Sequence, residues 1–407
     1  MKKVILVIMD GLPDGPAGKD SLKEAEKYSL NFLAQNGFCG IVTNNLDEHP
    51  DSGISHFVLF GYDRSEYPGR GFLEALGIGL KPMPETVYLR ANFSTVKEEP
   101  RKDIVPENPK TLMPPRLVVL DRRCGRDYSG IVEMAESIKE MNIDGVKVRF
   151  HKSLGHRGVV TISAVGVSPA VTNSDPGFVG KDVMEITPIV PEAEMTASTL
   201  NKWQYETYRI LSRHPQNRYR KIPANFVLLR GASSYKILKS FKEKHGLRGA
   251  VVAASPVIKG LGRALEMDVI EVSGANGTTN TNLRDKTLAA LEAVKTHDTV
   301  ILHIKGTDVA AHDKSYFAKR SFIERVDREV FRRLLEYVDI NNTVIAVTSD
   351  HPTSPIDGEH YGGDMPYLVF GKNIKSNGVK SFDIASCNLG SKITIDEFME
   401  QLTRFLS

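Results

Sequence analysis

The sequence predicts an α/β protein with a doubly wound, mostly parallel sheet and an inserted smaller α+β domain. Short runs rich in β-branched residues recur in the first and last thirds of the chain, at residues 4–11, 226–232, 299–308 and 343–351. These runs are apolar throughout rather than alternating, which is typical of strands covered on both faces. Helical stretches follow the runs, as expected where crossover helices join parallel strands.

The middle third of the chain has a different pattern. Residues 83–110 contain several prolines and a Lys/Glu-rich stretch. A strand-like run that begins at Val118, a helical segment at 131–141 and strand-like runs at 146–152 and 158–165 follow. We therefore expect an inserted domain at 83–185 and a sheet domain built from 1–82 and 186–407. Residues 196–213 predict an amphipathic helix that returns the chain, capped near Thr196 or Ser198.

Composition excludes several classes of protein. The 407 residues include 53 basic and 50 acidic side chains, a net charge of +3, which gives no case for nucleic acid or a membrane as the main partner. The apolar run near the N-terminus spans only 4–9 and is interrupted by Asp10, so it predicts a buried strand rather than a signal peptide. The three cysteines show no metal or redox spacing, and a reducing, cytoplasmic location is expected.

Polar residues stand at the ends of three of the predicted strands. Asp10, Asp308 and the pair Asp350–His351 each follow an apolar run. In doubly wound sheets the chemistry lies beyond the carboxyl ends of the strands. A carboxylate at the end of a buried strand is unfavourable unless it is paired or binds a metal. Asp10 therefore predicts a metal ligand, with a helix N-cap as the alternative.

A second motif joins Ser52 to His56. The two residues are four apart, so a helix would turn both side chains to one face. Ser52 could be an activated nucleophile, or it could cap the helix, and the local sequence alone favours the cap.

Further histidines complete the candidate metal ligands. Asp308 and His312 are again one helical turn apart, while His360 lies in the loop after His351. For Asp308 and His312 the structural alternative is an ordinary surface pair. For the loop that carries His360 it is a turn with a charged tip. Three aspartates, three histidines and one serine at strand ends would suffice for two divalent ions about 3.5–4 Å apart. Mixed carboxylate and imidazole ligands favour Mn²⁺ or Zn²⁺ over Ca²⁺, and metal coordination is one way to activate a serine.

The ordered motifs resemble a known family. They include MDG at Asp10, Ser-x-x-x-His at Ser52, GYD at 61–63, GRGFLEALGIGL at 69–80, LRANFST, DRRCGR, HRG, LLRGA, KGLGRALEMDVI, GANGTTNTN and HIKGTD. The series resembles the archaeal-type cofactor-independent phosphoglycerate mutases of the alkaline phosphatase superfamily over nearly the whole chain.

The resemblance implies specific roles for these residues. One metal would be held by Asp308, His312 and His360, and a second by Asp10, Asp350, His351 and the Ser52 oxygen. Ser52 would carry the phosphoryl group between 2-phosphoglycerate and 3-phosphoglycerate, a step of glycolysis and gluconeogenesis, without 2,3-bisphosphoglycerate. The ions would be Mn²⁺, Zn²⁺, Co²⁺ or Mg²⁺. The catalytic residues beside Ser52 would be Arg122, Arg126 and Lys259. The substrate-binding residues would be Arg90, Arg122, Arg123, Arg126, His156, Arg157 and Lys259.

The chain departs from the family pattern at three motifs, and the Thr-Pro-rich segment usual near residues 20–30 is absent. The usual Gly-Ser-Asp-Thr-Ala-His is here 51–56, DSGISH, the usual Thr-Asp-Thr-Asp-Pro-His is here 172–177, TNSDPG, and the usual Gly-Asp-His-Ser-Thr-Pro-Cys is here 349–355, SDHPTSP. Every implied metal ligand is retained. A metal-dependent phosphomonoesterase or another phosphomutase on the same site remains the alternative function. A binding protein that keeps only the fold is disfavoured because Ser52 and the ligands are intact.

Overall fold

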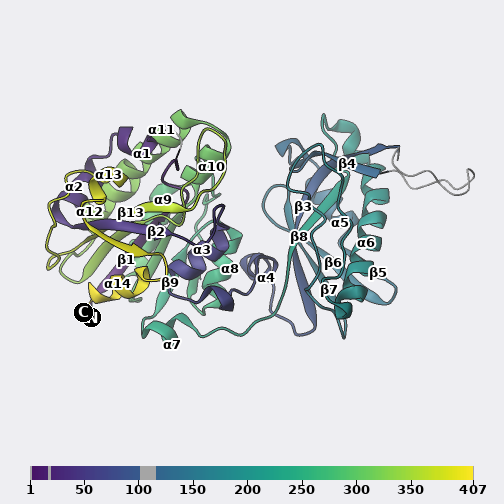
Figure 1. The fold of residues 1–407 in the computed structure, drawn as a ribbon, viewed down its shortest axis with the longest axis horizontal. Coiled ribbons are helices and arrows are strands. Elements are labelled where there is room, and N and C mark those ends of the chain that lie inside the picture. The colour runs from purple at the N-terminus through teal and green to yellow at the C-terminus, as the bar shows by residue number, and fades with distance from the viewer. Residues whose placement is uncertain (1, 17–19, 101–115, 407) are drawn as a thin grey trace, which may run out of the picture. The chain divides into compact units, whose positions relative to one another are not determined.

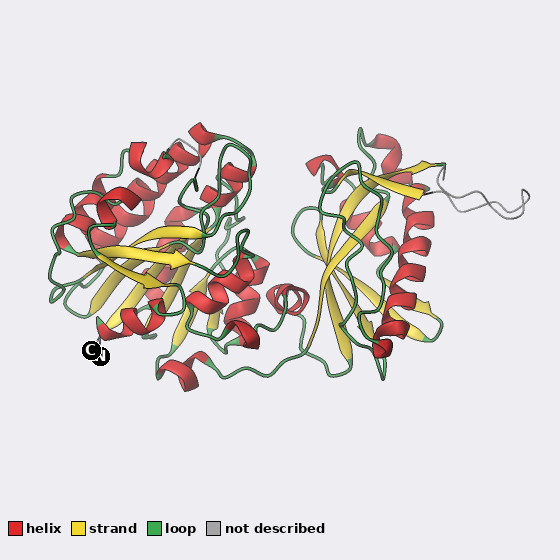
Figure 2. Cartoon of the chain, viewed as in Figure 1, coloured by secondary structure: helices red, strands yellow, loops and turns green. Residues whose placement is uncertain are grey.

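The computed structural model describes residues 2–16, 20–100 and 116–406. It divides into two compact units: the first comprises residues 1–67 and 237–407, and the second comprises residues 68–236. The end of the Lys/Glu-rich stretch, residues 101–103, and the rest of the range to 110 lie outside the described residues. Figures 1 and 2 show the elements of each unit.

The first unit is built on an eight-stranded sheet. In spatial order its strands are β10 (Asp268–Ile270), β9 (Gly249–Val252), β11 (Thr299–Ile304), β1 (Lys3–Met9), β12 (Thr343–Thr348), β13 (Gly363–Phe370), β2 (Phe38–Asn44) and β14 (Ser391–Thr394). The pairs from β10 to β12 are parallel, and β14 is parallel to β2. Only β13 runs antiparallel to its two neighbours among the strands described. The mostly parallel sheet predicted from the sequence is confirmed.

Helices cover both faces of this sheet (Figure 2). Ile5, Val7 and Met9 of β1 belong to a core that also includes α2, α9, α11 and α12. The alternate β1 residues, which point to the other face, are buried as well. The helices of the unit are α1 (Ser21–Glu24), α2 (Tyr28–Asn36), α3 (Ser52–Leu59), α7 (Phe241–His245), α8 (Pro256–Ala264), α9 (Leu283–Ala293), α10 (Gly306–His312), α11 (Tyr316–Val326), α12 (Arg332–Tyr337), α13 (Ile384–Cys387) and α14 (Phe398–Arg404), with a 3₁₀ turn at Arg64–Glu66 and a π-helical turn at Asp327–Phe331.

The second unit contains a six-stranded antiparallel sheet with helices. Its strands are β3 (Thr86–Glu99), β4 (Arg116–Asp121), β5 (Glu140–Ile143), β6 (Val146–Lys152), β7 (Arg157–Ser163) and β8 (Phe226–Ser234). The long strand β3 pairs with β4, β7 and β8. The helices are α4 (Arg70–Gly77), α5 (Ile131–Ser137) and α6 (Glu194–Ser212), with 3₁₀ turns at Cys124–Arg126, Pro191–Ala193 and Pro215–Tyr219.

The second unit extends beyond the expected inserted domain at both ends. The run at 226–232 is a strand, as predicted, but it is β8 and pairs with β3 rather than joining the parallel sheet. The helix α4 packs on β3 and β8 and belongs to the same unit. We therefore place the boundaries at 67/68 and 236/237 rather than at 82/83 and 185/186.

Two local expectations also change. The segment 131–141 is not one helix, because α5 ends at Ser137 and β5 begins at Glu140. The helix predicted at 196–213 is α6, but it begins at Glu194 after a 3₁₀ turn, without a side-chain cap from Thr196 or Ser198. Within the described residues, no helix combines the length and apolar composition needed to span a bilayer.

Candidate active site

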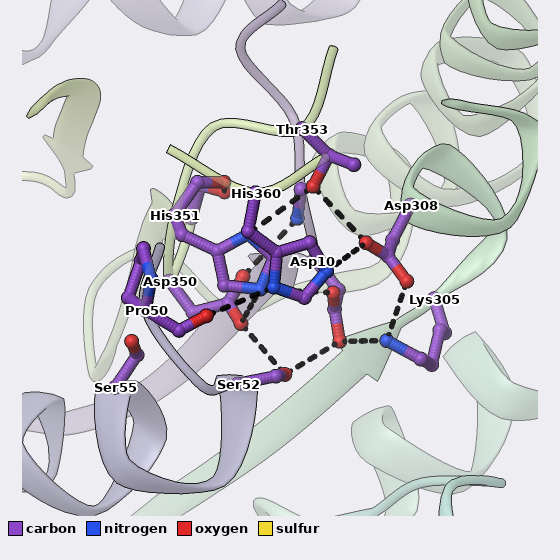
Figure 3. Close-up of polar contacts among 12 residues, drawn as sticks. Asp10, Pro50, Ser52, Ser55, Lys305, Asp308, Asp350, His351, Thr353 and His360 are labelled. Atoms are coloured by element: carbon purple, nitrogen blue, oxygen red, sulfur yellow. Dashed lines mark hydrogen bonds and ion pairs between the residues drawn. The ribbon is translucent and has the colours of Figure 1, made fainter. Parts of the chain in front are cut away.

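The carboxyl ends of three neighbouring parallel strands bring the predicted ligands together. The register pairs Met9 of β1 with Ile304 of β11, and Ile8 of β1 with Thr348 of β12. The residues that follow these strands therefore meet at one edge of the sheet, where Asp10, Asp308 and Asp350 lie (Figure 3). All three aspartates are almost completely buried.

One candidate metal group consists of Asp308, His312 and His360. The Nε2 atoms of His360 and His312 lie 3.2 and 3.4 Å from Oδ1 of Asp308 and 3.0 Å from each other. Each ring places Nδ1 against a backbone carbonyl, Gly358 O for His312 and Pro50 O for His360. A carbonyl only accepts, so Nδ1 carries the hydrogen and, in the neutral ring, Nε2 presents a lone pair. Two lone pairs and a carboxylate oxygen facing one point suit a divalent cation.

The second candidate group consists of Asp10, Asp350 and His351. Asp10 Oδ1 and His351 Nε2 are buried and have no hydrogen-bond partner, although they lie 3.9 Å apart. Nε2 of His351 is also 3.0 Å from Oδ2 of Asp350. Buried polar atoms without partners are costly, and a cation bound between these atoms would remove that cost. The donor set therefore fits a second metal ion.

Ser52 lies beside both carboxylates of the second group. Its Oγ is 2.9 Å from Asp350 Oδ2 and 3.4 Å from Asp10 Oδ2. The N-cap of α3 is Asp51, whose side chain accepts a hydrogen bond from Gly53 N. The capping role that the sequence favoured for Ser52 is thus filled by its neighbour, and the Ser52 hydroxyl points to the carboxylates instead (Figure 3).

Four side chains near these groups were not assigned a role from the sequence. His303 Nε2 contacts Asp10 Oδ2 at 2.9 Å, and Thr353 Oγ1 donates to Asp308 Oδ1 at 3.0 Å. Lys305 Nζ lies 2.8 Å from Oδ2 of both Asp10 and Asp308. His56 Nδ1 lies 3.2 Å from Asp350 Oδ2. A histidine inside the apolar strand β11 was a sequence signal for His303, because burying an imidazole needs a polar partner.

The electrostatics keep the carboxylates ionised. Burial would raise the pKa of Asp308, but Lys305 and the neighbouring histidines lower it well below its usual range. Burial and Asp350 would raise the pKa of Asp10, yet Lys305 and His303 leave it below its ordinary value. Burial lowers the pKa of His303 to about 4 and also lowers that of His312, so both rings are neutral near pH 7.

The second unit contains a cluster of arginines that outnumber the acidic side chains they contact. Arg122 makes two parallel hydrogen bonds of 2.8 Å to Asp175, and Arg90 Nε lies 3.3 Å from Glu74 Oε1. Arg157 stands opposite Asn92 of β3, and burial lowers the pKa of Arg90 well below its usual range. Two residues of this cluster were not predicted as binding residues, Arg70, which bonds Glu74 at 3.0 Å, and Arg230, which lies 4.0 Å from Asp175.

The other predicted substrate-binding residues are divided between the units. Arg123 precedes the 3₁₀ turn after β4 and Arg126 is its last residue, and both raise the positive potential around His156. Burial and these arginines, with Arg157 the strongest, lower the pKa of His156 to about 3. Lys259 belongs to the first unit, where its ammonium on α8 pairs with Glu271. The excess of arginines suits an anionic ligand with phosphate or carboxylate groups.

Comparisons with known proteins point to one family. A family model for 2,3-bisphosphoglycerate-independent phosphoglycerate mutase matches residues 34–217. A relative of that name from Archaeoglobus fulgidus is 37% identical over 388 residues, covering 93% of this chain and 91% of the relative. Another, from Methanopyrus kandleri, is 36% identical over 403 residues, covering 96% and 92%.

Solved structures are similar over the full length. A cofactor-independent phosphoglycerate mutase from Thermoplasma acidophilum is 32% identical with a TM-score of 0.65, and the similarity covers 100% of both chains. A protein from Pyrococcus horikoshii is 27% identical with a TM-score of 0.79, covering 100% of this chain and 97% of the other. Identity above 30% along most of the chain, together with this shared fold, shows that the chain belongs to the 2,3-bisphosphoglycerate-independent phosphoglycerate mutase family.

Proposed function

We propose that this chain interconverts 3-phosphoglycerate and 2-phosphoglycerate through a phosphoserine formed on Ser52 at a two-metal site. The observation that carries the proposal is the position of Ser52 Oγ, 2.9 Å from Asp350 in the buried edge where both ligand groups converge. At this position the Ser52 hydroxyl is within reach of an ion held by Asp10 and Asp350. Family membership supplies the substrate class.

Two groups of side chains would hold the ions. Asp308, His312 and His360 would bind one ion, and Asp10, Asp350, His351 and the Ser52 oxygen would bind the other. When bound, such ions lower the pKa of a coordinated hydroxyl and neutralise phosphoryl oxygens. The mixture of imidazole and carboxylate ligands favours Mn²⁺, Zn²⁺, Co²⁺ or Mg²⁺ over Ca²⁺.

The residues of the chain account for the transfer as follows. Ser52 Oγ forms a bond to phosphorus while the bond from phosphorus to the substrate oxygen breaks, and the proton of the Ser52 hydroxyl passes to the released oxygen. The product of this half-reaction is glycerate beside phospho-Ser52. The other hydroxyl of glycerate then attacks phosphorus, the bond to Ser52 Oγ breaks, and the proton of the attacking hydroxyl passes to Ser52 Oγ. No phosphate is lost as long as water is kept away from phospho-Ser52.

The arginine cluster would bind the rest of the substrate. Arg90, Arg122 and Arg157 of the second unit present guanidinium groups on adjoining segments, with Arg123, Arg126 and His156 nearby. A planar guanidinium matches carboxylate and phosphate oxygens in pairs. Lys259 would add a cation from the first unit.

An assay coupled to enolase, with Mn²⁺ and 3-phosphoglycerate, tests the proposal. The same reaction is followed in parallel for release of inorganic phosphate. Formation of 2-phosphoglycerate well in excess of phosphate supports a mutase. Phosphate release without 2-phosphoglycerate would replace the proposal with a phosphomonoesterase on the same site.

A further inference from the structure

A single ammonium group joins the two candidate metal groups. Lys305 Nζ lies 2.8 Å from Asp10 Oδ2 and 2.8 Å from Asp308 Oδ2 (Figure 3). Asp10 belongs to one ligand group and Asp308 to the other. The sequence places Lys305 between β11 and α10, directly after the strand that carries His303.

The contacts with Lys305 leave the other oxygen of each aspartate facing histidine nitrogens. Asp308 Oδ1 faces His312 and His360 at 3.4 and 3.2 Å, and Asp10 Oδ1 lies 3.9 Å from His351 Nε2. In each carboxylate, Oδ2 therefore contacts the lysine, and Oδ1 faces the histidine nitrogens beside which a cation would bind. Lys305 Nζ makes its hydrogen bonds to the two Oδ2 atoms.

The charge around this point is otherwise strongly negative. Asp10, Asp308 and Asp350 are buried together, and ionised carboxylates at such positions need nearby positive charge. His56 and His351 flank Asp350, whereas Asp10 and Asp308 share the ammonium of Lys305. The lysine side chain is itself only 17% exposed, so its charge is little screened by water.

We propose that Lys305 is a built-in counter-ion that holds Asp10 and Asp308 in their metal-binding arrangement before any ion is present, and that its positive charge weakens the affinity of both sites for divalent ions. The inference rests on the proposed metal sites and adds a residue that positions their ligands. Both consequences follow from one charge. The ammonium offsets carboxylate repulsion in the metal-free protein, and it repels a cation that binds beside it.

This arrangement has a functional consequence. An enzyme whose metal site is already neutralised can fold without its ions and exchange them without losing the site. Metal affinity is expected to be lower as a result. Coulomb repulsion between the ammonium and a nearby divalent ion exceeds the gain in affinity from fixing two carboxylate rotamers.

The substitution Lys305→Met tests the inference, because methionine keeps most of the side-chain length and removes the charge. Thermal unfolding is measured for the whole chain in excess chelator and in saturating Mn²⁺, and Mn²⁺ binding is measured by titration calorimetry. We expect the melting temperature of Lys305→Met to fall more in chelator than in Mn²⁺. We also expect Mn²⁺ to bind about tenfold or more tightly than to the wild type. Lys305→Arg, which restores the charge, should bring both values back toward the wild type.

Lys319→Met is the matched control. Lys319 is fully buried, and its ammonium binds Asp14 and the carbonyls of Pro13 and Thr353 rather than a candidate metal ligand. Its loss should lower the melting temperature by a similar amount with and without Mn²⁺, as expected for a purely structural lysine.

Three outcomes would overturn the inference. They are equal losses of stability for Lys305→Met in chelator and in Mn²⁺, weaker rather than tighter Mn²⁺ binding, and no recovery with arginine. If Lys305→Met does not fold in either condition, Lys305→Gln replaces it, and Mn²⁺ binding no tighter than that of the wild type overturns the inference. Failure of the wild type to bind Mn²⁺ would instead reject the proposed metal sites, so the two failures are distinguishable.

Discussion

The Nε2 atoms of His312 and His360 lie 3.0 Å apart, and each ring is fixed by a contact between Nδ1 and a backbone carbonyl. Removing one ring leaves Asp308 and one histidine, too few protein ligands for tight binding of that ion. We predict that His312→Phe binds one Mn²⁺ ion instead of two and loses mutase activity. Metal content after gel filtration and the enolase-coupled assay check both expectations.

His297→Phe serves as the control for that substitution. His297 is a buried histidine paired with Asp268 at 2.8 Å, near the start of β11 rather than at its carboxyl end. Its loss should reduce stability without changing the number of bound ions. Two ions retained by active His312→Phe protein would contradict the assignment of His312.

The bidentate contact between Arg122 and Asp175 predicts that Arg122→Ala impairs both the stability of the second unit and catalysis. Asp175 is buried, so the substitution leaves its carboxylate poorly paired and should lower the stability of the second unit by about 1–3 kcal/mol. Losing a charged contact to the substrate should also raise KM or reduce kcat/KM by roughly 10–150-fold. Trp203, the only tryptophan in the sequence, is buried in this unit, so its fluorescence in urea reports the unfolding.

Arg209→Ala is a suitable comparison for Arg122→Ala. Arg209 forms an exposed pair with Glu206 on α6, and such surface pairs contribute little. Kinetics and unfolding should both stay close to the wild type. An unchanged KM and kcat in Arg122→Ala would remove Arg122 from the substrate site.

The buried His156 predicts a specific acid sensitivity of the second unit. Burial and the neighbouring arginines lower its pKa from 6.5 to about 3. Between these values the unfolded chain binds more protons than the folded one, so stability falls as the pH falls. The loss attributable to His156 is about 2 kcal/mol at pH 5.

Urea unfolding at pH 7 and pH 5, followed by Trp203 fluorescence, tests this expectation. His156→Gln should lose less stability than the wild type between the two values. The same change at the exposed His49, in the first unit, is the control. Parallel losses in wild type and His156→Gln would show that other groups carry the acid sensitivity.

The polar site residues at the strand ends were predictable because the cost of burying them is visible in the neighbouring sequence. A carboxylate directly after a buried apolar run, as at Asp10, needs a partner wherever the strand lies. The run at 226–232 looked the same as the parallel strands because β8 is also largely buried, and burial alone does not say which sheet a strand joins. Pairing is decided by contacts distant in sequence, so the inserted unit was longer than expected.

The role of Ser52 also could not be decided from the local sequence. The sequence could not separate a nucleophile from a helix cap, because a serine at the start of α3 suits either role. In the structure Asp51 accepts the capping hydrogen bond, so Ser52 is not the cap. Lys305 was missed for a related reason, because its partner Asp10 is 295 residues away and only the register of β1 against β11 brings them together.

The last prediction concerns covalent phosphorylation of Ser52. Ser52 Oγ lies 2.9 Å from Asp350, and the hydroxyl of a free serine is almost wholly protonated at neutral pH, so a bound metal ion is needed to activate it. Ser52→Ala removes the nucleophile but leaves Asp10, Asp350 and His351 in place. The variant should therefore fold and still bind metal, yet lose mutase activity almost completely.

Brief incubation with 3-phosphoglycerate, an acid quench and peptide mass spectrometry should find phosphate on the peptide that contains Ser52 in the wild type but not in Ser52→Ala. Ser55→Ala is the matched control. Ser55 lies three residues further along α3 and accepts a hydrogen bond from Asn44 rather than facing the aspartates. That variant should keep the phosphopeptide and most of its turnover, because Ser55 contacts neither ligand group directly. Interconversion of the two phosphoglycerates by Ser52→Ala at a rate comparable to the wild type would reject phosphoserine as the intermediate, even though the family and the fold would stand.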